Sequence, residues 1–182
     1  MSVRVTEADV RLTPKPWMTN SYIRKVLRAL NAKGKEARFV GGCVRDELLK
    51  LPVNEVDLAT PERPEIVIQL MRAAGIKVLS TGIKHGTVTA VISNKQYQIT
   101  SLRIDTKTNG RHALVDFTED WKKDAMRRDF TINALSASPK GIIYDYVNGL
   151  QDLSEKRIKF VGQAEHRIRE DHLRILRYFR FI

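Results

Sequence analysis

Apolar residues at helical spacing mark the first regular element of the chain. They recur three or four positions apart, at Tyr22, Ile23, Val26, Leu27 and Leu30. This spacing is that of one face of an amphipathic helix. Thr19-Asn20-Ser21 in front of them can cap a helix, and Gly34 behind them is a typical stop. The pattern therefore predicts a helix between these two signals.

Short apolar runs then alternate with further helical patterns. Strands are predicted at residues 37–40, 55–59 and 76–79, and helices at 44–50 and 65–74. This alternation of strand and helix is typical of α/β proteins.

Two longer strands follow, at residues 87–92 and 97–102, joined by the polar residues 93–96. The length of this connection predicts a hairpin. An antiparallel pair beside a strand–helix–strand unit implies a mixed sheet. Residues 103–119 are polar without an apolar period, so a long loop is predicted there.

The remaining pattern is mostly helical. We predict helices at residues 121–127 and 130–136 and a short strand at 142–146. A turn is predicted after Gly149, then a strand-like segment at 156–161 and helix from 165 to the end. Residues 1–18 mix charges with two prolines, which predicts an extended or mobile segment.

Charge and cysteine content narrow the function classes. The formal net charge of +11 favours an anionic partner such as nucleic acid, nucleotide or anionic lipid, although a solvated basic surface is an equal alternative. Cys43 is the only cysteine, which excludes an internal disulfide and a Cys-based zinc site. The chain has no signal-peptide pattern and no long apolar run. We therefore expect a soluble, cytoplasmic protein.

A diglycine turn is the first candidate for phosphate binding. Gly41-Gly42 follows a buried strand and precedes Arg45 and Asp46. Glycines let backbone N–H groups approach phosphate closely, and an arginine supplies charge-assisted hydrogen bonds. The turn and these two charged residues together predict a phosphate site.

A pair of carboxylates is the candidate metal site. Glu55 and Asp57 are separated by one residue on a predicted strand, so both should face the same side. Two carboxylates can hold one Mg²⁺ between them. The alternative is that both are ordinary solvent-facing strand residues.

Two basic segments are further candidates. Arg127-Arg128-Asp129, with Asn133, can cap a helix or contact phosphate and ribose. The loop at 81–87 carries a lysine and a histidine between glycines, and an ordinary connection is the favoured interpretation there.

The last helical pattern carries a stripe of charged residues. Asp171 and Arg174 stand three positions apart, which places them on one helical face if the helix is continuous. They can form a surface ion pair or face a base edge together. Arg177 and Arg180 continue the stripe.

Several motifs occur in a specific order: GGCVRD, E-x-D, TGIKHGTVTAVI, SLR, RRDFTINAL and EDHLRILRYFRF. This series resembles that of the class II tRNA nucleotidyltransferases, the CCA-adding enzymes, and of the similar bacterial poly(A) polymerases. The TGIKHGTVTAVI segment is closer to the CCA-adding branch. The resemblance implies an α/β (α+β) fold, a DNA polymerase β-like nucleotidyltransferase head at 19–149, and the start of an all-helical neck at 150–182 that is cut short.

The same resemblance implies roles for the motif residues. The strand carboxylates, Glu55 and Asp57, would hold Mg²⁺ or Mn²⁺, and Gly41 and Gly42 would contact the triphosphate. Arg128 and Asp129 would bind the ribose, while Asp171 and Arg174 would pair with the base of CTP or ATP. The substrate would be a tRNA 3′ end, and the segment at 103–119 coincides with a flexible loop of the family.

Three departures from the family pattern qualify this expectation. Glu55 stands where the family has Asp, and Gln98 stands at the position of a third family carboxylate. Both changes predict weaker Mg²⁺ binding, because hard cations favour carboxylate oxygens. The apolar final helix has no stop signal, which predicts a fragment, or a short chain completed by a second polypeptide or by itself.

These observations leave three readings of function. The first is a nucleotidyltransferase that adds CMP and AMP to tRNA, with activity reduced by Glu55, Gln98 and the short length. The second is a non-catalytic relative that binds nucleotide or RNA. The third is a poly(A) polymerase-type activity.

Overall fold

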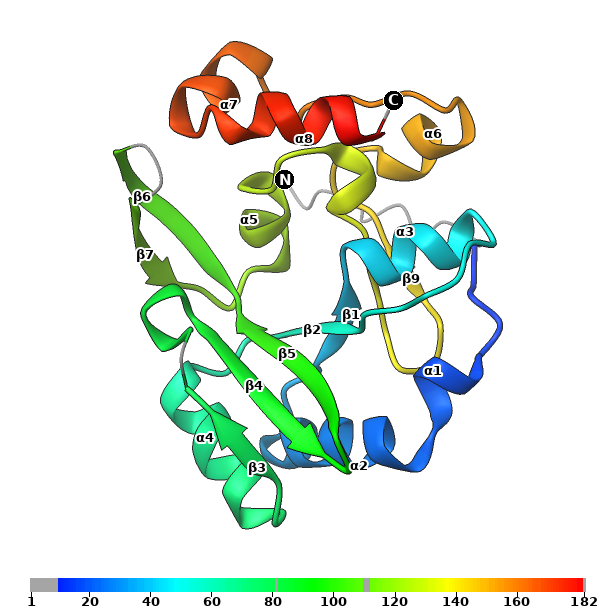
Figure 1. Cartoon of the computed structure of the whole chain (residues 1–182), viewed down its shortest axis with the longest axis vertical. Coiled ribbons are helices and arrows are strands. Elements are labelled where there is room, and N and C mark those ends of the chain that lie inside the picture. Colours follow the sequence, from blue (N-terminus) through cyan, green and yellow to red (C-terminus); the bar gives the residue numbers. More distant parts are fainter. Residues whose placement is uncertain (1–9, 81, 110–111, 182) are drawn as a thin grey trace, which may run out of the picture.

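A mixed sheet forms the centre of the computed structural model, which describes residues 10–80, 82–109 and 112–181, with side chains described for all of these except 106–109 and 112–114. The strand order is β3-β4-β5-β2-β1-β8-β9 (Figure 1). Only β2 and β5 run parallel, and the other neighbouring strands are antiparallel. The bounds are β1 Arg38–Val40, β2 Asp57–Thr60, β3 Lys77–Leu79, β4 Thr87–Ile92, β5 Lys95–Ser101, β8 Ser136–Ala137 and β9 Ile143–Tyr144. The predicted mixed sheet is confirmed.

Helices surround this sheet. They are α1 Pro16–Thr19, α2 Ser21–Leu30, α3 Gly42–Leu48, α4 Pro64–Ala73, α5 Trp121–Met126, α6 Gly149–Ser154, α7 Ala164–Glu170 and α8 Leu173–Phe181, with 3-10 turns η1 Asn31–Lys33, η2 Ile83–His85 and η3 Thr131–Asn133. Figure 1 shows α7 and α8 at one end of the molecule and α2 and α4 at the other. Among the described residues, no helix combines the length and the apolar content needed to cross a bilayer.

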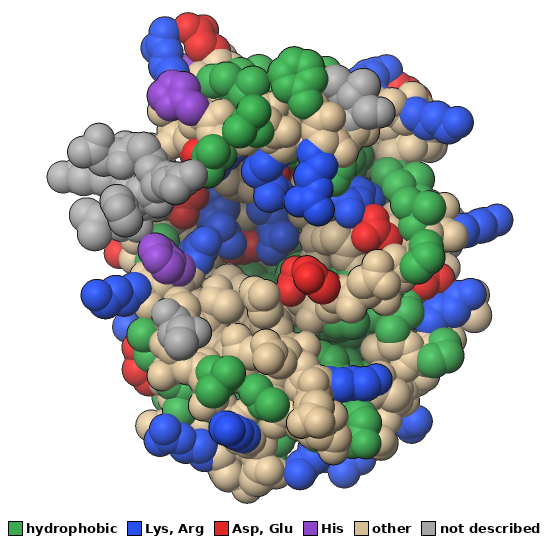
Figure 2. All heavy atoms as spheres, in the orientation of Figure 1, with side chains coloured by type: hydrophobic (Ala, Val, Ile, Leu, Met, Phe, Trp, Pro, Cys, Tyr) green, Lys and Arg blue, Asp and Glu red, His purple; other side chains and the backbone are tan. Residues whose placement is uncertain are grey.

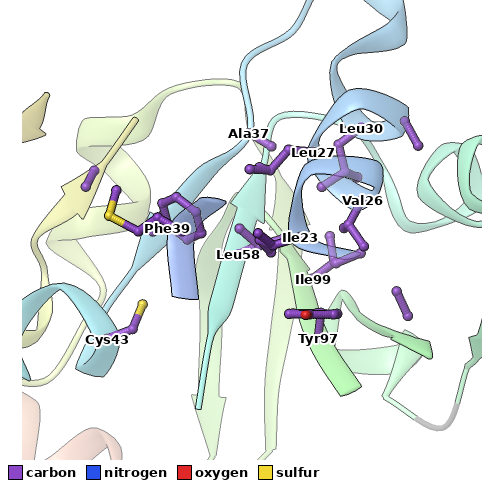
Figure 3. Packing of buried hydrophobic residues seen from close by; sticks show 14 of the residues in the cluster. Ile23, Val26, Leu27, Leu30, Ala37, Phe39, Cys43, Leu58, Tyr97 and Ile99 are labelled. Atoms are coloured by element: carbon purple, nitrogen blue, oxygen red, sulfur yellow. The ribbon is translucent and has the colours of Figure 1, made fainter. Parts of the chain in front are cut away.

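The core lies between α2 and the sheet. Ile23, Val26 and Leu30 of α2 are fully buried, and they pack among strand residues such as Leu58 and Ile99 (Figure 3). The side chain of Asn20 caps α2 by accepting from two backbone N–H groups at 3.1 Å each. The helix predicted from periodicity and its cap is therefore confirmed.

The predicted placement of Glu55 on a strand is wrong. β2 begins at Asp57, and the chain before it is irregular. The reason is that β1 is only three residues long and pairs with β2 no further than Leu58, so no neighbour continues the ladder back to Glu55. β1 and β2 are also antiparallel, and the parallel partner of β2 is β5, from Asp57 opposite Gln98 onward.

The long loop predicted at 103–119 is instead a hairpin. β6 (Arg103–Asn109) pairs antiparallel with β7 (His112–Phe117) as a separate two-stranded ribbon. The ribbon pairs through backbone groups, which carry no side-chain pattern, so its polar sequence did not reveal it. The neighbouring turn is also tighter than predicted, because β5 starts at Lys95 and only Ser93 and Asn94, both with positive φ, connect it to β4.

Three local predictions after residue 127 are corrected. The helix predicted at 130–136 is the 3-10 turn η3 followed by β8, because Ser136 and Ala137 pair with β1. The segment at 156–161 contains one isolated bridge, Phe130 to Phe160, and no strand. A helix, α6, occupies 149–154, where a turn was expected.

The ends of the chain also differ from expectation. Of the lead-in segment 1–18, residues 1–9 lie outside the described part, and α1 is helical from Pro16 onward. The helix predicted from 165 to the end divides into α7 and α8, since Asp171 between them is extended with φ −155° and ψ 106°. The domain division at 19–149 and 150–182 stays a prediction.

Helix α6 packs closely against η3, the turn that directly follows Arg127-Arg128-Asp129 and Phe130. A Cβ atom added at Gly149 would lie 2.3 Å from the backbone oxygen of Thr131. In the same contact, the buried hydroxyl of Thr131 donates to the Asp152 carboxylate at 2.7 Å. The absence of a side chain at Gly149 therefore lets the two backbones meet.

Gly149→Ala is predicted to lower the free energy of unfolding by about 1–3 kcal/mol, because one backbone must move to relieve the overlap. Gln151→Ala, at an exposed position of the same helix, is the matched control and should change it by less than about 0.5 kcal/mol. Urea unfolding followed by circular dichroism measures both. Equal effects of the two substitutions would show that α6 does not depend on this contact.

Candidate functional site

A cavity of about 560 Å³ opens between the sheet and the C-terminal helices. Figure 2 shows Lys and Arg side chains gathered in a hollow below α7 and α8. The cavity is lined by Val40, Gly41, Gly42, Arg45, Asp57, His85, Thr87, Gln98, Thr100, Arg103, Asp105, Val115, Arg127, Arg128, Asp129, Asn133, Asp171, Arg174, Arg177 and Phe181. Most of the site residues predicted from sequence therefore converge on one place.

Three predicted site residues lie elsewhere. Glu55, Asp46 and Arg180 line an adjacent cavity of about 290 Å³, which shares Gly42 and Asp57 with the main cavity, among others. Glu55 is exposed at this second opening. The two cavities thus approach Asp57 from different sides.

The diglycine turn forms part of the cavity wall. Gly41 has φ +71° and ψ −129°, a conformation that favours glycine. Its carbonyl accepts the N–H groups of Val44 and Arg45, and α3 begins at Gly42, two residues before the predicted start. A Cβ at Gly41 would lie 3.4 Å from the Nη1 atom of Arg128. The turn therefore brings backbone next to an arginine of another segment.

Asp57 stands beside Gln98 on the two parallel strands. Both line the main cavity. Burial raises the pKa of Asp57, the charge of Glu55 raises it further, and the charge of Arg128 opposes the shift. A cation would relieve both destabilising effects, so the donor chemistry fits a divalent ion. Among the described residues, no group of three or more His, Cys, Asp and Glu side chains is arranged to hold a metal.

A buried carboxylate holds the two arginines of the RRD segment. Asp124, on α5, is 3% exposed. Its Oδ1 atom accepts from Nε and Nη2 of Arg127 at 2.8 and 2.7 Å, and its Oδ2 atom accepts from Nε and Nη2 of Arg128 at 3.3 and 3.1 Å. Burial would raise the pKa of Asp124, but the charges of Arg128 and Arg127 outweigh it and hold the pKa below the usual value. Asp124 therefore stays ionised and fixes both guanidinium groups.

Asp129 and Asn133 extend this network toward the helices. Asp129 Oδ1 accepts from the Asn133 amide at 3.2 Å, and its Oδ2 atom pairs with Nη2 of Arg177 at 2.6 Å. Arg45 Nη1 donates to Asn133 Oδ1 at 2.6 Å. The Arg45 guanidinium also lies 4.8 Å from the ring centre of Phe181. These contacts join α3, η3 and α8 around the cavity.

The predicted placement of Asp171 and Arg174 on one helical face is wrong, because the chain breaks at Asp171. The Asp171 carboxylate instead accepts the backbone N–H of Leu173 at 3.0 Å. Arg174 pairs with Glu170 at 2.6 Å rather than with Asp171. Asp171 and Arg174 nevertheless both line the main cavity.

Sequence patterns did not assign Asp124 and Arg103 to this site, and they favoured an ordinary connection for the candidate loop that carries His85. Asp124 precedes Arg127 and Arg128 by three and four positions on a predicted helix, and this ion-pair spacing was an available signal. Arg103 belongs to the SLR segment, but no role was assigned to it. Nothing local to His85 distinguishes it from an ordinary loop residue.

Comparison with protein families gives an extended match. The family described as "Poly A polymerase head domain" matches residues 37–159. The chain is 49% identical over 147 residues to a protein named CCA tRNA nucleotidyltransferase 1, mitochondrial, from Homo sapiens, which covers 80% of this chain and 34% of that protein. A CCA-adding enzyme of Lactobacillus delbrueckii subsp. bulgaricus is 41% identical, covering 100% of this chain and 42% of that protein. The chain thus spans well under half the length of these relatives.

Solved structures agree with the sequence matches. The Bacillus stearothermophilus CCA-adding enzyme in complex with CTP superposes with a TM-score of 0.78 at 36% identity, covering 90% of this chain and 39% of that one. A tRNA nucleotidyltransferase complexed with a primer tRNA and an incoming ATP analog superposes with a TM-score of 0.68 at 32% identity, covering 86% and 44%. The fold and the family expected from the motifs are both confirmed.

Asp124→Asn is predicted to lower the free energy of unfolding by about 3 kcal/mol at neutral pH, because two partly buried arginines lose their anion. A carboxylate with a depressed pKa contributes its stability above the unfolded-state pKa and loses it as pH falls through the folded-state pKa. The difference between wild type and variant should therefore shrink below pH 3.8, the ordinary value for aspartate. Urea unfolding across a pH series measures this.

Asp120→Asn is the matched control for that series. Asp120 caps the same helix through backbone N–H groups, and asparagine caps equally well. Its effect should be less than about 0.5 kcal/mol at neutral pH. A pH-independent loss of stability in Asp124→Asn would contradict the ion-pair role.

Proposed function

The chain belongs to the poly(A) polymerase head-domain family, in the branch of the class II CCA-adding enzymes, and from this premise we propose that it adds CMP and AMP from CTP and ATP to a tRNA 3′ end. The observation that carries the proposal is the convergence of Gly41, Arg128 and Asp57 on one cavity. Phosphate-binding groups beside an ionised carboxylate that can hold a metal are what in-line nucleotidyl transfer requires.

Different groups of residues that line the cavity are proposed to bind different parts of a nucleotide. The backbone at Gly41-Gly42 and the guanidinium of Arg128 are proposed to bind the triphosphate, because they line the same cavity and Gly42 begins α3, where backbone N–H groups have no acceptor within the helix. Asp129 and Asn133, already linked to each other, would accept and donate to the ribose hydroxyls. Arg174, on α8, lines the same cavity.

The base would lie against the C-terminal helices. Asp171 and Arg174 line the cavity from the segment where α7 ends and α8 begins. The pair supplies one acceptor and one planar donor, which together can read a base edge. Arg174 is oriented for this by Glu170 at 2.6 Å.

Glu55 and Asp57 are proposed to hold Mg²⁺ or Mn²⁺. When bound, the ion would supply positive charge next to the phosphate and favour ionisation of the tRNA 3′ hydroxyl. The chain's own part is to keep Asp57 ionised and aimed into the cavity, and Arg128 assists by opposing the upward shift of the Asp57 pKa. Gln98 contributes only a neutral oxygen.

The partners of the chain follow from the same proposal. Its named relatives are more than twice as long as the matched region, and a structural relative is complexed with a primer tRNA and an ATP analog. Leu176 and Phe179 on α8 are each 68% exposed, which suits coverage by further helical polypeptide, either a second chain or a second copy. We propose a cytoplasmic setting for the reaction.

A second candidate function is nucleotide or RNA binding without chemistry. It is favoured by the position of Glu55, exposed and outside β2, and by the neutral Gln98 beside Asp57. The residues proposed to bind the nucleotide would then be in place, while the affinity for a metal ion would be low. A poly(A)-type activity stays a third alternative, distinguished by which nucleotide is added.

The chain is predicted to incorporate labelled CMP into tRNA lacking CCA when the helical C-terminal part of a relative is supplied separately. Gel analysis of the tRNA measures incorporation with CTP, with ATP and with both, and long AMP tails would indicate the poly(A)-type alternative. Asp57→Asn is the matched control and should abolish incorporation. Binding of CTP by a folded chain that adds no nucleotide with either Mg²⁺ or Mn²⁺ would support the non-catalytic alternative.

The double substitution Glu55→Asp with Gln98→Glu is predicted to raise the rate by roughly 10² to 10³-fold, by analogy with the effect of one preorganised electrostatic group. The added carboxylate at 98 would stand directly beside Asp57 and bind the metal with it. Titration of the rate with Mg²⁺ should show half-saturation at a lower concentration. An unchanged rate and Mg²⁺ dependence would mean that these two residues do not limit the protein.

A further inference from the structure

Arg103 is a cavity residue to which neither the motif analysis nor the network around Asp124 gives a partner for its side chain. It is the first residue of β6, and its backbone N–H donates to Asp124 Oδ1 at 3.2 Å. The side chain lines the main cavity together with Arg127 and Arg128. The backbone is therefore fixed next to the buried carboxylate, and the side chain forms part of the cavity lining.

Two donor atoms of the Arg103 guanidinium, Nε and Nη1, are buried and lack a hydrogen-bond acceptor among the described residues. Burial and, after it, the charge of Arg127 lower the pKa of Arg103 to about 10, although the charges of Asp105 and Asp124 act in the opposite direction. An unsatisfied buried cation destabilises the folded state unless an anion joins it.

The other arginines of the cavity differ in this respect. Arg127 and Arg128 are held by Asp124, Arg174 by Glu170 and Arg177 by Asp129. Arg45 donates to Asp46 and Asn133. These side chains donate hydrogen bonds to acceptors of the protein. In the part of the chain that the structure describes, Nε and Nη1 of Arg103 have no such acceptor.

Gly86 and Phe117 pack closely next to the Arg103 side chain. A Cβ at Gly86 would lie 2.9 Å from the Phe117 ring and 3.8 Å from Nη1 of Arg103, and Gly86 also has φ +76°. The glycine carbonyl accepts the N–H of Ser101 at 2.8 Å, two residues before the arginine. The glycine loop at 82–86 thus packs against the base of Arg103 without filling the cavity.

We propose that Arg103 binds a phosphate of the incoming nucleoside triphosphate beyond the α-phosphate. The inference rests on the proposed function, because it assigns a further residue to the same site. Asp124 pairs with the guanidinium groups of Arg127 and Arg128. The guanidinium of Arg103 adds a third positive charge near them, opposite the carboxylates of Asp124 and Asp105, so three cations face two anions in this part of the cavity. Arg128 lies next to the diglycine turn, and Arg103 and Arg128 line the same cavity, so a polyanion at that turn would have both guanidinium groups around it.

The test compares the affinities of CTP, CDP and CMP for wild type and for Arg103→Gln by isothermal titration calorimetry. The variant should bind CTP about 10- to 100-fold more weakly, as expected for one charge-assisted contact, and bind CMP unchanged. Inorganic tripolyphosphate is the probe without a nucleoside and should weaken in parallel with CTP. Arg103→Lys should recover part of the loss, since it keeps the charge but not the planar donors.

Arg72→Gln is the matched control, because it removes one positive charge from an exposed position on α4. It should leave the CTP to CMP affinity ratio at the wild-type value. The melting temperature of ligand-free Arg103→Gln should equal or exceed that of wild type, because the uncompensated cation is gone. A purely structural arginine would give the opposite result, a lower melting temperature.

The outcomes separate this inference from the proposed function. If wild type prefers CTP to CMP and Arg103→Gln keeps the same preference, Arg103 is not a phosphate ligand although the site binds nucleotide. If Arg103→Gln weakens binding of tRNA and leaves CTP unaffected, Arg103 contacts RNA and the inference is overturned. If wild type binds none of the three nucleotides, the proposed function itself fails.

Discussion

Repulsion between arginines that converge on one cavity is the constraint on which the architecture of this site depends. Several guanidinium groups that line one cavity repel one another unless neighbouring carboxylates offset their charges. Asp124 performs this role for Arg127 and Arg128, and it does so from inside the protein, where the attraction is screened little. Asp129 and Glu170 act in the same way toward the C-terminal helices. The positive wall is therefore in place before any ligand arrives.

The same ion pairs connect parts of the chain that are distant in sequence. Asp129 and Arg177 are 48 positions apart, and their contact holds α8 over the cavity. Aromatic packing strengthens this junction, because the fully buried Phe130 meets the rings of Phe160, Tyr178 and Phe181. The residues proposed to bind a nucleotide therefore overlap with those that hold α8 in place, so stability and ligand affinity should change together when this junction is altered.

The anion-binding and cation-binding halves of the site are unequal. The phosphate wall is preorganised by buried ion pairs, whereas the metal side has Asp57 in the cavity, a neutral amide at Gln98 and an exposed Glu55 outside the strand. Hard divalent ions favour carboxylates, so the metal side is the weaker half. Under the proposed function, this arrangement would favour nucleotide binding more strongly than the chemical step.

The sequence by itself determined the elements whose signals are local and the family to which the chain belongs. Helix α2 follows from its apolar period and its Asn20 cap, and the ordered motifs indicated which segments would meet in one site. Only the tertiary structure decided where strands start, because β2 extends as far as its neighbours pair with it, and this leaves Glu55 outside. It also decided that 103–119 pairs as a hairpin and that Asp171 breaks the last helix. The unsatisfied guanidinium of Arg103 could not be predicted, since burial and missing partners are properties of packing between distant segments and leave no trace in local spacing.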